Sequence, residues 1–447
     1  MQIDAAKRKK NRFRMKTRLE VAVTPEEKAV LKSVDHYSED ILEFTCRLVR
    51  EQSTLGNEAS VVKVMEDELS GLGYSPVRVP IDPRKLGRHP GFAPVDWEYV
   101  ENDGRDNIVA VVKAVRSGGK SALFNGHLDV VSPEPLSYWN SDPFKPMPEN
   151  GWLYGRGAGD MKSGIAAMVY AARAVERAGF GLGADLILEG VIEEECCGNG
   201  ALACLDAGYD ADAVLIPEPF GPTILTSQVG VLWFRVEVSG KPRHVLEAGL
   251  GANAIEKCFP LIQALREMEE KLNNMPRPDE FRESAHPLNL NVGIIKGGDW
   301  PSTVAASAGF DCRMSFFPGM DFAEIRNIIT NTVEQSAAKD PWLRLNPPRT
   351  TFYGFRSEGH TISMDTPALS MLSACHKEIS GKPANRYIAT CTTDLRAFMS
   401  FGKGQATCFG PIAENIHAQN ERVNMESIIH TARVYALFLS RWCGLCA

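Results

Sequence analysis

Histidine and carboxylate side chains recur where short apolar runs of the chain end, and side chains of these types could hold a metal ion. His127 and Asp129 directly follow the apolar run 122–125. Residues two positions apart project to the same side of a strand, so Asp129 could orient the imidazole of His127 as a metal ligand. Taken alone, the pair is more often a hydrogen-bonded histidine in a turn with no metal.

The stretch 154–164 has glycines at positions 155, 157 and 159 and places Asp160 at the entrance to a helix. Glycines at alternate positions let the backbone bend sharply or approach a ligand. The spacing does not match the dinucleotide fingerprint G-x-G-x-x-G, and the Gly-Lys-Ser/Thr of a P-loop is absent. Asp160 is therefore either a metal ligand or a helix cap.

Three consecutive acids, Glu193, Glu194 and Glu195, end the apolar run 185–192. Adjacent carboxylates repel each other, so either a bound cation or solvent must offset their charge. The Gly-Asn-Gly that follows at positions 198–200 favours a buried turn over an open loop. Cys196 and Cys197 are weaker ligand candidates, because neighbouring cysteines do not easily chelate one ion.

Glu218, between two prolines after the run 213–216, and His417, in a polar turn before the last helix, complete the set. Open α/β sheets bind ligands at the carboxyl ends of their strands, and mixed imidazole and carboxylate ligands suit Zn²⁺. Two histidines with several acids exceed the needs of one tetrahedral ion that keeps an open position. The residues therefore predict two metals sharing a carboxylate, which can generate hydroxide and polarise a carbonyl.

The pattern of apolar runs around these residues predicts that the elements positioning them form an α/β fold. Helical residues 24–75, beginning at Thr24 and Pro25, precede short apolar runs typical of buried strands, at 107–115, 122–125, 185–192 and 213–216. A crossover helix is expected at 163–178. This alternation predicts a largely parallel sheet.

From about residue 228 the order becomes β-α-β-β-α-β, the signature of a ferredoxin-like unit. The strands are expected at 229–238, 288–296, 305–315 and 342–345, and the helices at 252–272 and 322–338. The predicted architecture is one discontinuous domain, residues 24–227 and 349–447, with a smaller domain inserted at 228–348.

The 447 residues are 44% hydrophobic and 23% charged, which is typical of a globular protein and excludes bulk disorder. A net charge of -7 disfavours nucleic acid as a partner, and without a run of 18 apolar residues no membrane span is expected. The eleven scattered cysteines predict reduced thiols and a cytoplasmic location.

Residues 1–23 form a basic extension without a signal peptide's apolar region. We expect a solvated helix there, or a true start at Met15, with a nucleic-acid or membrane tail as the alternative.

Together and in this order, the motifs resemble the zinc-dependent amidohydrolase and exopeptidase family of acetylornithine deacetylase, succinyl-diaminopimelate desuccinylase, aminoacylase and carboxypeptidase G. The resemblance covers roughly residues 35–440. It implies a three-layer α/β/α catalytic domain like that of the zinc exopeptidases, and an inserted ferredoxin-like lid domain that forms a homodimer.

The resemblance also implies a role for each residue of the site. His127, Asp160 and Glu218 would hold one Zn²⁺, and Asp160, Glu195 and His417 the other, with Asp160 bridging and Co²⁺ as a substitute metal. Asp129 would orient His127. Glu194 would be the general base that takes a proton from the bridging water and returns it to the leaving amine.

Three further residues match substrate-side positions of the family. His244 of the lid would reach the neighbouring subunit's site and stabilise the oxyanion, Arg313 would grip a substrate carboxylate, and Asp394 falls in a substrate-side loop. The segment 302–305 departs from the family's usual Asn-x-Val-Pro, which puts one substrate contact in doubt.

The spacing of the motifs is most similar to the acetylornithine deacetylase and desuccinylase branch. The expected function is hydrolysis of the amide bond of an N-acyl amino acid or related N-acyl amine by metal-bound hydroxide. A dipeptidase or carboxypeptidase acting on short peptides is the alternative within the family. A non-catalytic metal-binding scaffold is the alternative outside it.

Overall fold

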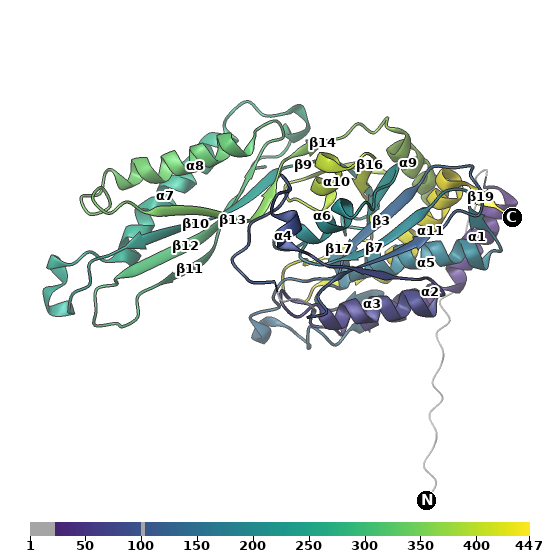
Figure 1. Cartoon of the computed structure of the whole chain (residues 1–447), viewed down its shortest axis with the longest axis horizontal. Coiled ribbons are helices and arrows are strands. Elements are labelled where there is room, and N and C mark those ends of the chain that lie inside the picture. The colour runs from purple at the N-terminus through teal and green to yellow at the C-terminus, as the bar shows by residue number, and fades with distance from the viewer. Residues whose placement is uncertain (1–22, 100–102) are drawn as a thin grey trace, which may run out of the picture.

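The computed structural model describes residues 23–99 and 103–447 (Figure 1). The predicted basic extension lies outside the described residues except for Val23. Buried apolar residues form two main clusters. One draws on the chain between Val229 and Phe355, and the other on residues up to Leu225 and from Ile362 onward. Figure 1 shows the corresponding elongated molecule, with one sheet at each end.

The larger part is built on a six-stranded sheet in the order β1-β2-β7-β3-β8-β16. Its strands are β1 (Val77–Val79), β2 (Asn107–Val112), β3 (Ala122–His127), β7 (Leu186–Val191), β8 (Ala213–Ile216) and β16 (Gln405–Cys408). Pairs β3/β7, β3/β8 and β8/β16 are parallel, but β1/β2 and β2/β7 are antiparallel. The sheet is thus mixed rather than largely parallel, because no crossover helix joins β2 to β3.

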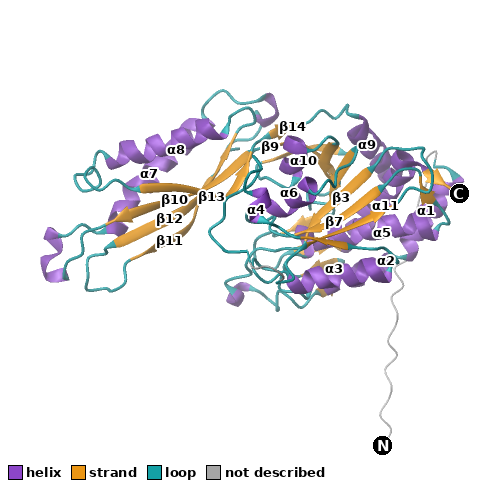
Figure 2. Cartoon of the chain, viewed as in Figure 1, coloured by secondary structure: helices purple, strands orange, loops and turns teal. Residues whose placement is uncertain are grey.

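Helices cover both faces of this sheet, which gives the expected three-layer α/β/α fold (Figure 2). α5 (Ser163–Arg177) and α11 (Met425–Leu439) pack together on one face, and α6 (Asn199–Asp206) and α10 (Leu395–Phe401) lie on the other. The remaining helices are α1 (Pro25–His36), α2 (Ser38–Val49), α3 (Ala59–Gly71), α4 (Pro83–Leu86) and α9 (Pro367–Ser380). In the described part of the chain, no helix has both the length and the apolar character that crossing a membrane requires.

The expected helical region 24–75 contains three helices, α1, α2 and α3. Thr24 caps α1 as predicted, since its hydroxyl accepts a hydrogen bond from the backbone N–H of Glu27. The chain turns at Tyr37, whose ring packs against Tyr170 of α5 at 5.2 Å between centroids. This break lets α1 and α2 both contact α5.

The smaller part has a four-stranded antiparallel sheet in the order β11-β12-β10-β13. Its elements follow the expected β-α-β-β-α-β order: β10 (Gly230–Ser239), α7 (Ala254–Asn273), β11 (Leu290–Gly297), β12 (Ser307–Phe316), α8 (Phe322–Ala337) and β13 (Arg349–Ser357). Helix α7 buries Cys258, Leu261, Leu265, Met268 and Leu272, which recur every three or four residues. We call this ferredoxin-like unit the lid.

The prediction of a fourth strand at 342–345 is wrong, because those residues form a turn after α8 and the fourth strand is β13. Asp340 accepts hydrogen bonds from the backbone N–H groups of Trp342 and Leu343, which closes the turn. Leu343 is fully buried there, so the apolar run reflects burial in a turn. β13 continues to Ser357, beyond the expected limit at residue 348, and the domain limits themselves stay a prediction.

Three small sheets arrange the loops around the central sheet. They are β14-β9-β15, β17-β18-β5-β4 and β19-β6. Their strands are β4 (Met147–Glu149), β5 (Trp152–Tyr154), β6 (Gly181–Leu182), β9 (Thr223–Gln228), β14 (His360–Thr361), β15 (Asn385–Ala389), β17 (Ala413–Glu414), β18 (Arg422–Asn424) and β19 (Leu445–Cys446). Pairing of β5 with β18 places the chain after β5, which carries Asp160, beside the chain between β17 and β18, which carries His417.

Candidate active site

Four of the predicted metal ligands meet at the carboxyl edge of the central sheet. His127 ends β3, and its Nε2 lies 3.1 Å from Oδ1 of Asp160. His417 Nε2 lies 3.3 Å from Oδ2 of Asp160 and 3.0 Å from Oε2 of Glu195. Asp160 therefore has one carboxylate oxygen facing each imidazole, which is the arrangement a bridging ligand needs. The His417 side chain is 52% exposed and the other three are mostly buried, so the cluster opens to solvent beside His417.

Glu218 and Glu194, the remaining ligand and the predicted base, are buried beside this cluster. Burial raises the pKa of Glu218 well above its ordinary value, and the charge of Asp160 adds to the effect. Burial likewise raises the pKa of Glu194, helped by Asp394 and Glu218. The Oε1 atom of Glu194 is buried and has no hydrogen-bond partner among the described residues.

The pKa values of the two histidines are also raised, which for an imidazole favours the positively charged form. Burial lowers the pKa of His127, but its hydrogen bond to Asp160 and the charges of Asp160, Glu194 and Asp129 together raise that pKa well above the ordinary value. The charge of Glu195 raises the pKa of His417 to about 11. The surroundings therefore favour positive charge at this point and disfavour further negative charge.

Asp129 holds the acidic loop as well as the histidine. His127 Nδ1 lies 3.0 Å from the main-chain carbonyl of Asp129 and 3.7 Å from its carboxylate, so the main-chain oxygen is the nearer partner of the ring. The carboxylate accepts hydrogen bonds from the backbone N–H groups of Glu194 at 3.2 Å and Glu195 at 3.0 Å. Asp129 thus fixes the backbone that carries the predicted base and one ligand.

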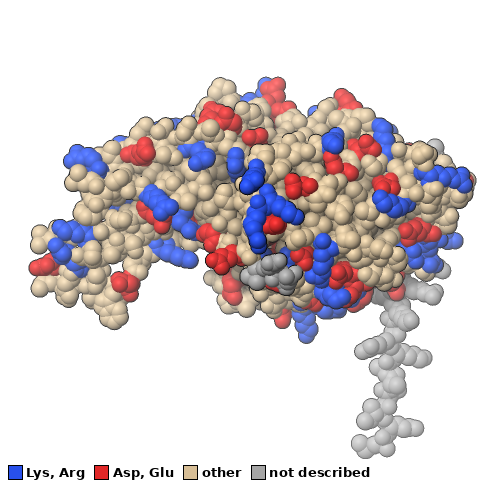
Figure 3. Space-filling view, in the orientation of Figure 1, with Lys and Arg blue, Asp and Glu red and all other residues tan. Residues whose placement is uncertain are grey.

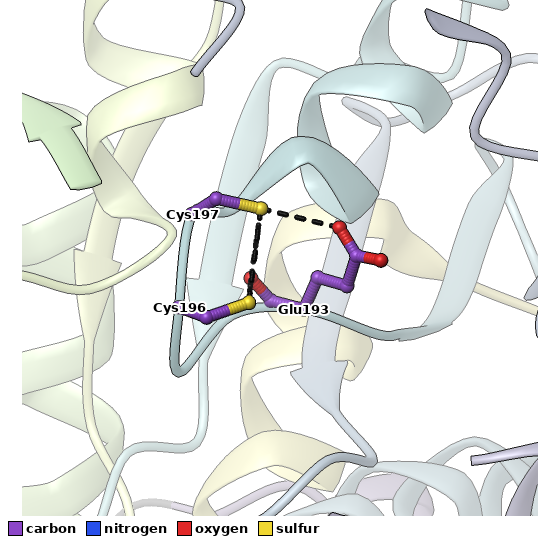
Figure 4. Close-up of side chains that lie close together, drawn as sticks. All are labelled: Glu193, Cys196 and Cys197. Atoms are coloured by element: carbon purple, nitrogen blue, oxygen red, sulfur yellow. Dashed lines mark hydrogen bonds between the residues drawn. The ribbon is translucent and has the colours of Figure 1, made fainter. Parts of the chain in front are cut away.

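Glu193, the first of the three acids, points away from the metal-ligand cluster. Its carboxylate accepts hydrogen bonds from Tyr99 at 2.7 Å and from Arg105 at 3.1 Å. Figure 4 shows the thiols of Cys196 and Cys197 on the same side of the loop, with Cys197 Sγ 3.2 Å from Glu193. The repulsion expected among the three acids is therefore relieved at Glu193 by a buried arginine.

The two thiols make a group that could in principle hold a cation with Glu193. However, the Cys197 thiol and burial raise the pKa of Cys196, and burial raises that of Cys197, so both stay protonated. Because the thiolate is the form that binds metal ions, Cys196 and Cys197 remain weaker ligand candidates than the imidazoles and carboxylates. All eleven cysteines lie within the described residues and are free thiols.

Glu421, for which no role was predicted, connects the loops that carry Asp160 and His417. Glu421 is 1% exposed and accepts a hydrogen bond from Arg156 at 2.6 Å. It also accepts from the backbone N–H groups of Gly157, Gly159 and Asp160. Gly157 adopts φ +77°, where a side chain would be strained. The only signal in the sequence was an acid four residues after His417, because the partner Arg156 is 265 positions away.

The three predicted substrate-side residues lie in different surroundings. His244 is exposed on the lid, and its Nδ1 accepts a hydrogen bond from the backbone N–H of Leu246. Arg313 on β12 is half-buried and donates to the carbonyl of Thr390, 3.2 Å away in the larger part. Asp394 is 1% exposed, and burial raises its pKa to about 6. Asp394 is therefore buried and does not face open solvent.

We predict that Glu421→Gln lowers the free energy of unfolding by about 3–5 kcal/mol, because it leaves the charge of Arg156 buried without its partner. Urea unfolding followed by circular dichroism measures the loss. The control is Glu414→Gln, which removes an exposed partner of Arg422 and should change stability by about 0–1 kcal/mol. Equal effects of the two substitutions would show that Glu421 does not brace the loops.

Comparison with known proteins extends the resemblance to named relatives. The sequence pattern of Peptidase family M20/M25/M40 matches residues 123–441. The chain is 29% identical over 374 residues to N-formyl-4-amino-5-aminomethyl-2-methylpyrimidine deformylase from Bacillus subtilis, covering 79% of this chain and 86% of the relative. It is 25% identical over 416 residues to succinyl-diaminopimelate desuccinylase from Thioalkalivibrio sulfidiphilus, covering 90% of this chain and 98% of the relative.

Solved structures share the fold at lower sequence identity. The di-peptidase Dug1p from Saccharomyces cerevisiae superimposes with a TM-score of 0.74 at 13% identity, covering 93% of this chain and 98% of that chain. Human carnosine dipeptidase 1 gives a TM-score of 0.71 at 16% identity, covering 92% and 98%. The resemblance inferred from the motifs is confirmed, and the chain belongs to Peptidase family M20/M25/M40, a family of metal-dependent hydrolases of amide bonds.

Proposed function

We propose that this hydrolase cleaves the amide bond of an N-acyl amino acid or a related N-acyl amine. The observation that carries the proposal is the buried Oε1 of Glu194, which has no partner among the described residues and lies beside a cluster of imidazoles and carboxylates. The names of the relatives support the class of bond, since deformylases and desuccinylases remove an acyl group from an amine.

The residues of the site fit two divalent cations. His127, Asp160 and Glu218 would hold one, and Asp160, Glu195 and His417 the other. Ligand atoms of His127, Asp160 and Glu195 lie within 4.8 Å of one another, and the raised pKa values of Glu194 and Glu218 indicate a need for positive charge. Imidazole and carboxylate ligands suit Zn²⁺, with Co²⁺ as a substitute. Such ions lower the pKa of water and polarise a carbonyl.

Glu194 then performs the proton transfers. Its free carboxylate oxygen accepts a proton from the attacking water and later donates it to the nitrogen of the leaving amine. Asp129 holds the Glu194 backbone, so the carboxylate stays in place through both transfers. Burial and the nearby carboxylates raise the pKa of Glu194, which suits a group that must keep the proton between the two steps.

Arg313 is the proposed contact for a substrate carboxylate. Its guanidinium extends from the lid to the carbonyl of Thr390, and the planar fork of arginine can bind a carboxylate through two parallel hydrogen bonds. Asp394, two residues before a buried arginine, is the proposed support of the substrate-side loop. Because Arg313 belongs to the lid, substrate binding would involve both parts of the chain.

We further propose a homodimer formed through the lid, with His244 completing the active site of the partner subunit. His244 is exposed and its hydrogen bond stays within the lid, so the ring is available to a second copy. The eleven free thiols support a reducing compartment, and the cytoplasm is the proposed location.

Replacing Glu194 with glutamine should lower kcat by about 10²–10⁴-fold, the usual contribution of general acid–base catalysis. The metal content, measured by mass spectrometry, should remain that of the unmodified protein. Glu195→Gln is the matched control, because it should lose metal together with activity. Full activity of the Glu194 variant would remove this residue from the role of base.

The function itself is tested with N-formyl, N-acetyl and N-succinyl amino acids and with dipeptides, by measuring release of the free amine. We expect turnover of an N-acyl substrate, its loss after treatment with a chelator, and its recovery with Zn²⁺ or Co²⁺. Cleavage of dipeptides alone would favour the peptidase alternative. Turnover that survives complete metal removal would contradict the metal assignment.

The dimer proposal predicts complementation between two inactive variants, His244→Ala and Glu194→Gln. In an equal mixture that exchanges subunits, half of the dimers are mixed, and each mixed dimer has one site with both residues intact. Activity should therefore recover to about a quarter of the unmodified level. No recovery in a mixture shown to exchange subunits would place His244 outside the partner's site.

A further inference from the structure

A cavity of about 400 Å³ lies at the junction between the larger part and the lid. Residues of α6 and α10 line it on one side, and Phe322 and the chain from Arg356 to His360 line it on the other. The lining includes none of the residues proposed to hold metal or to transfer protons. The cavity is therefore separate from the site described above.

Arg396 of α10 is the main charged group of this cavity. The residue is 7% exposed, yet neither of its Nη atoms donates a hydrogen bond to any residue in the described ranges. The nearest carboxylate oxygen, Oδ1 of Asp394, is 3.8 Å from Nη2, beyond hydrogen-bond distance. Gly198 leaves room for the guanidinium, because a Cβ there would lie 1.2 Å from Nη2.

Buried donors without an acceptor, such as the Nη atoms of Arg396, are unusual in proteins, because burying an unpaired donor costs free energy. The ring of Phe355 lies 4.6 Å from the guanidinium carbon and supports one face of the group, but offers no acceptor in its plane. Arg396 is thus held in place with donors that an oxygen-rich ligand in the cavity could satisfy.

The opposite wall adds further donors. Arg356 stacks over the ring of Phe322 at 4.8 Å, and His360 has a buried Nε2 without a partner among the described residues. Burial, followed by the charge of Arg396, lowers the pKa of His360 to about 4, so the ring is neutral and can donate one hydrogen bond. Glu358 is the single carboxylate in the lining, against two guanidinium groups.

The surface around the junction is also basic. Figure 3 shows Lys and Arg side chains gathered near the middle of this face, where α4 lies in Figure 1. Helix α4 carries the exposed residues Arg84 and Lys85, and Pro90 and Gly91, a few residues later, line the cavity. A positive field at the mouth of a cavity attracts small anions.

We propose that this cavity binds a small metabolite through its phosphate or carboxylate group, with Arg396 and Arg356 as the cationic contacts. The planar fork of arginine matches the oxygen atoms of either group. Arg396 belongs to the larger part and Arg356 to the lid strand β13, so the bound anion links the two parts. Asp394, two residues before Arg396, connects the cavity to the buried acids of the active site.

The test measures Tm of the full-length, metal-loaded protein as inorganic phosphate is added at constant ionic strength. A ligand that binds only the folded state raises Tm in a saturable way. Arg396→Gln should raise the half-saturating phosphate concentration by about tenfold or more, because charge-assisted hydrogen bonds are lost. Arg356→Gln should raise it as well, while Arg282→Gln, an exposed arginine elsewhere in the lid, should not.

Repeating the titration with succinate separates the two ligand classes. A response to phosphate alone assigns a phosphate ligand, and a response to both assigns a general oxyanion site. If Arg396→Gln fails to fold, the exposed Arg356 provides the decisive variant. An unchanged phosphate response in the folded Arg396 and Arg356 variants, as expected for an anion bound only at the metal centre, overturns the proposal.

Discussion

Several carboxylates must lie close together in a buried place at the carboxyl edge of the central sheet, and the rest of the structure is arranged around this electrostatic constraint. Burial raises the pKa of both Glu194 and Glu218. The charge of Glu218 adds to the effect on Glu194, and the charge of Asp160 adds to the effect on Glu218. Carboxylates in such surroundings bind protons or cations rather than carry their full charge. The mutual repulsion of these carboxylates therefore favours the binding of cations at the site.

Three buried acids around the proposed metal ligands each have an arginine near them. Glu193 is paired with Arg105. Glu421 is paired with Arg156 between the loops that carry Asp160 and His417. Asp394 has only the more distant Arg396. Glu193 and Glu421, which are paired with arginines, thus differ from the proposed metal ligands, which have no arginine partner among the described residues. Arg396 differs from Arg105 and Arg156 because its Nη atoms have no hydrogen-bond partner in the same ranges.

Much of this site could be predicted from the sequence because the proposed ligands lie in short local motifs, most of them next to an apolar run. The turn at 342–345 and the antiparallel β2 were not predictable in this way, since a short apolar run looks the same in a strand and in a buried turn. The role of Glu421 depends on Arg156, 265 positions away, and that of Glu193 depends on Arg105. Pairings over such separations come from the folded topology, which local patterns do not record.

The lid and the acidic loop are connected by residues that the motifs did not include. The carbonyl of Pro94 accepts a hydrogen bond from Gly354 of β13, and Asp96 pairs with Arg235 of β10 at 3.1 Å. Trp97 packs in the same apolar cluster as Cys196 and Cys197, directly after the acids. A change in lid orientation would therefore act on the segment 94–97, which contacts the loop that carries Glu194. The lid is in this way part of what positions the proposed base, as well as a source of substrate contacts.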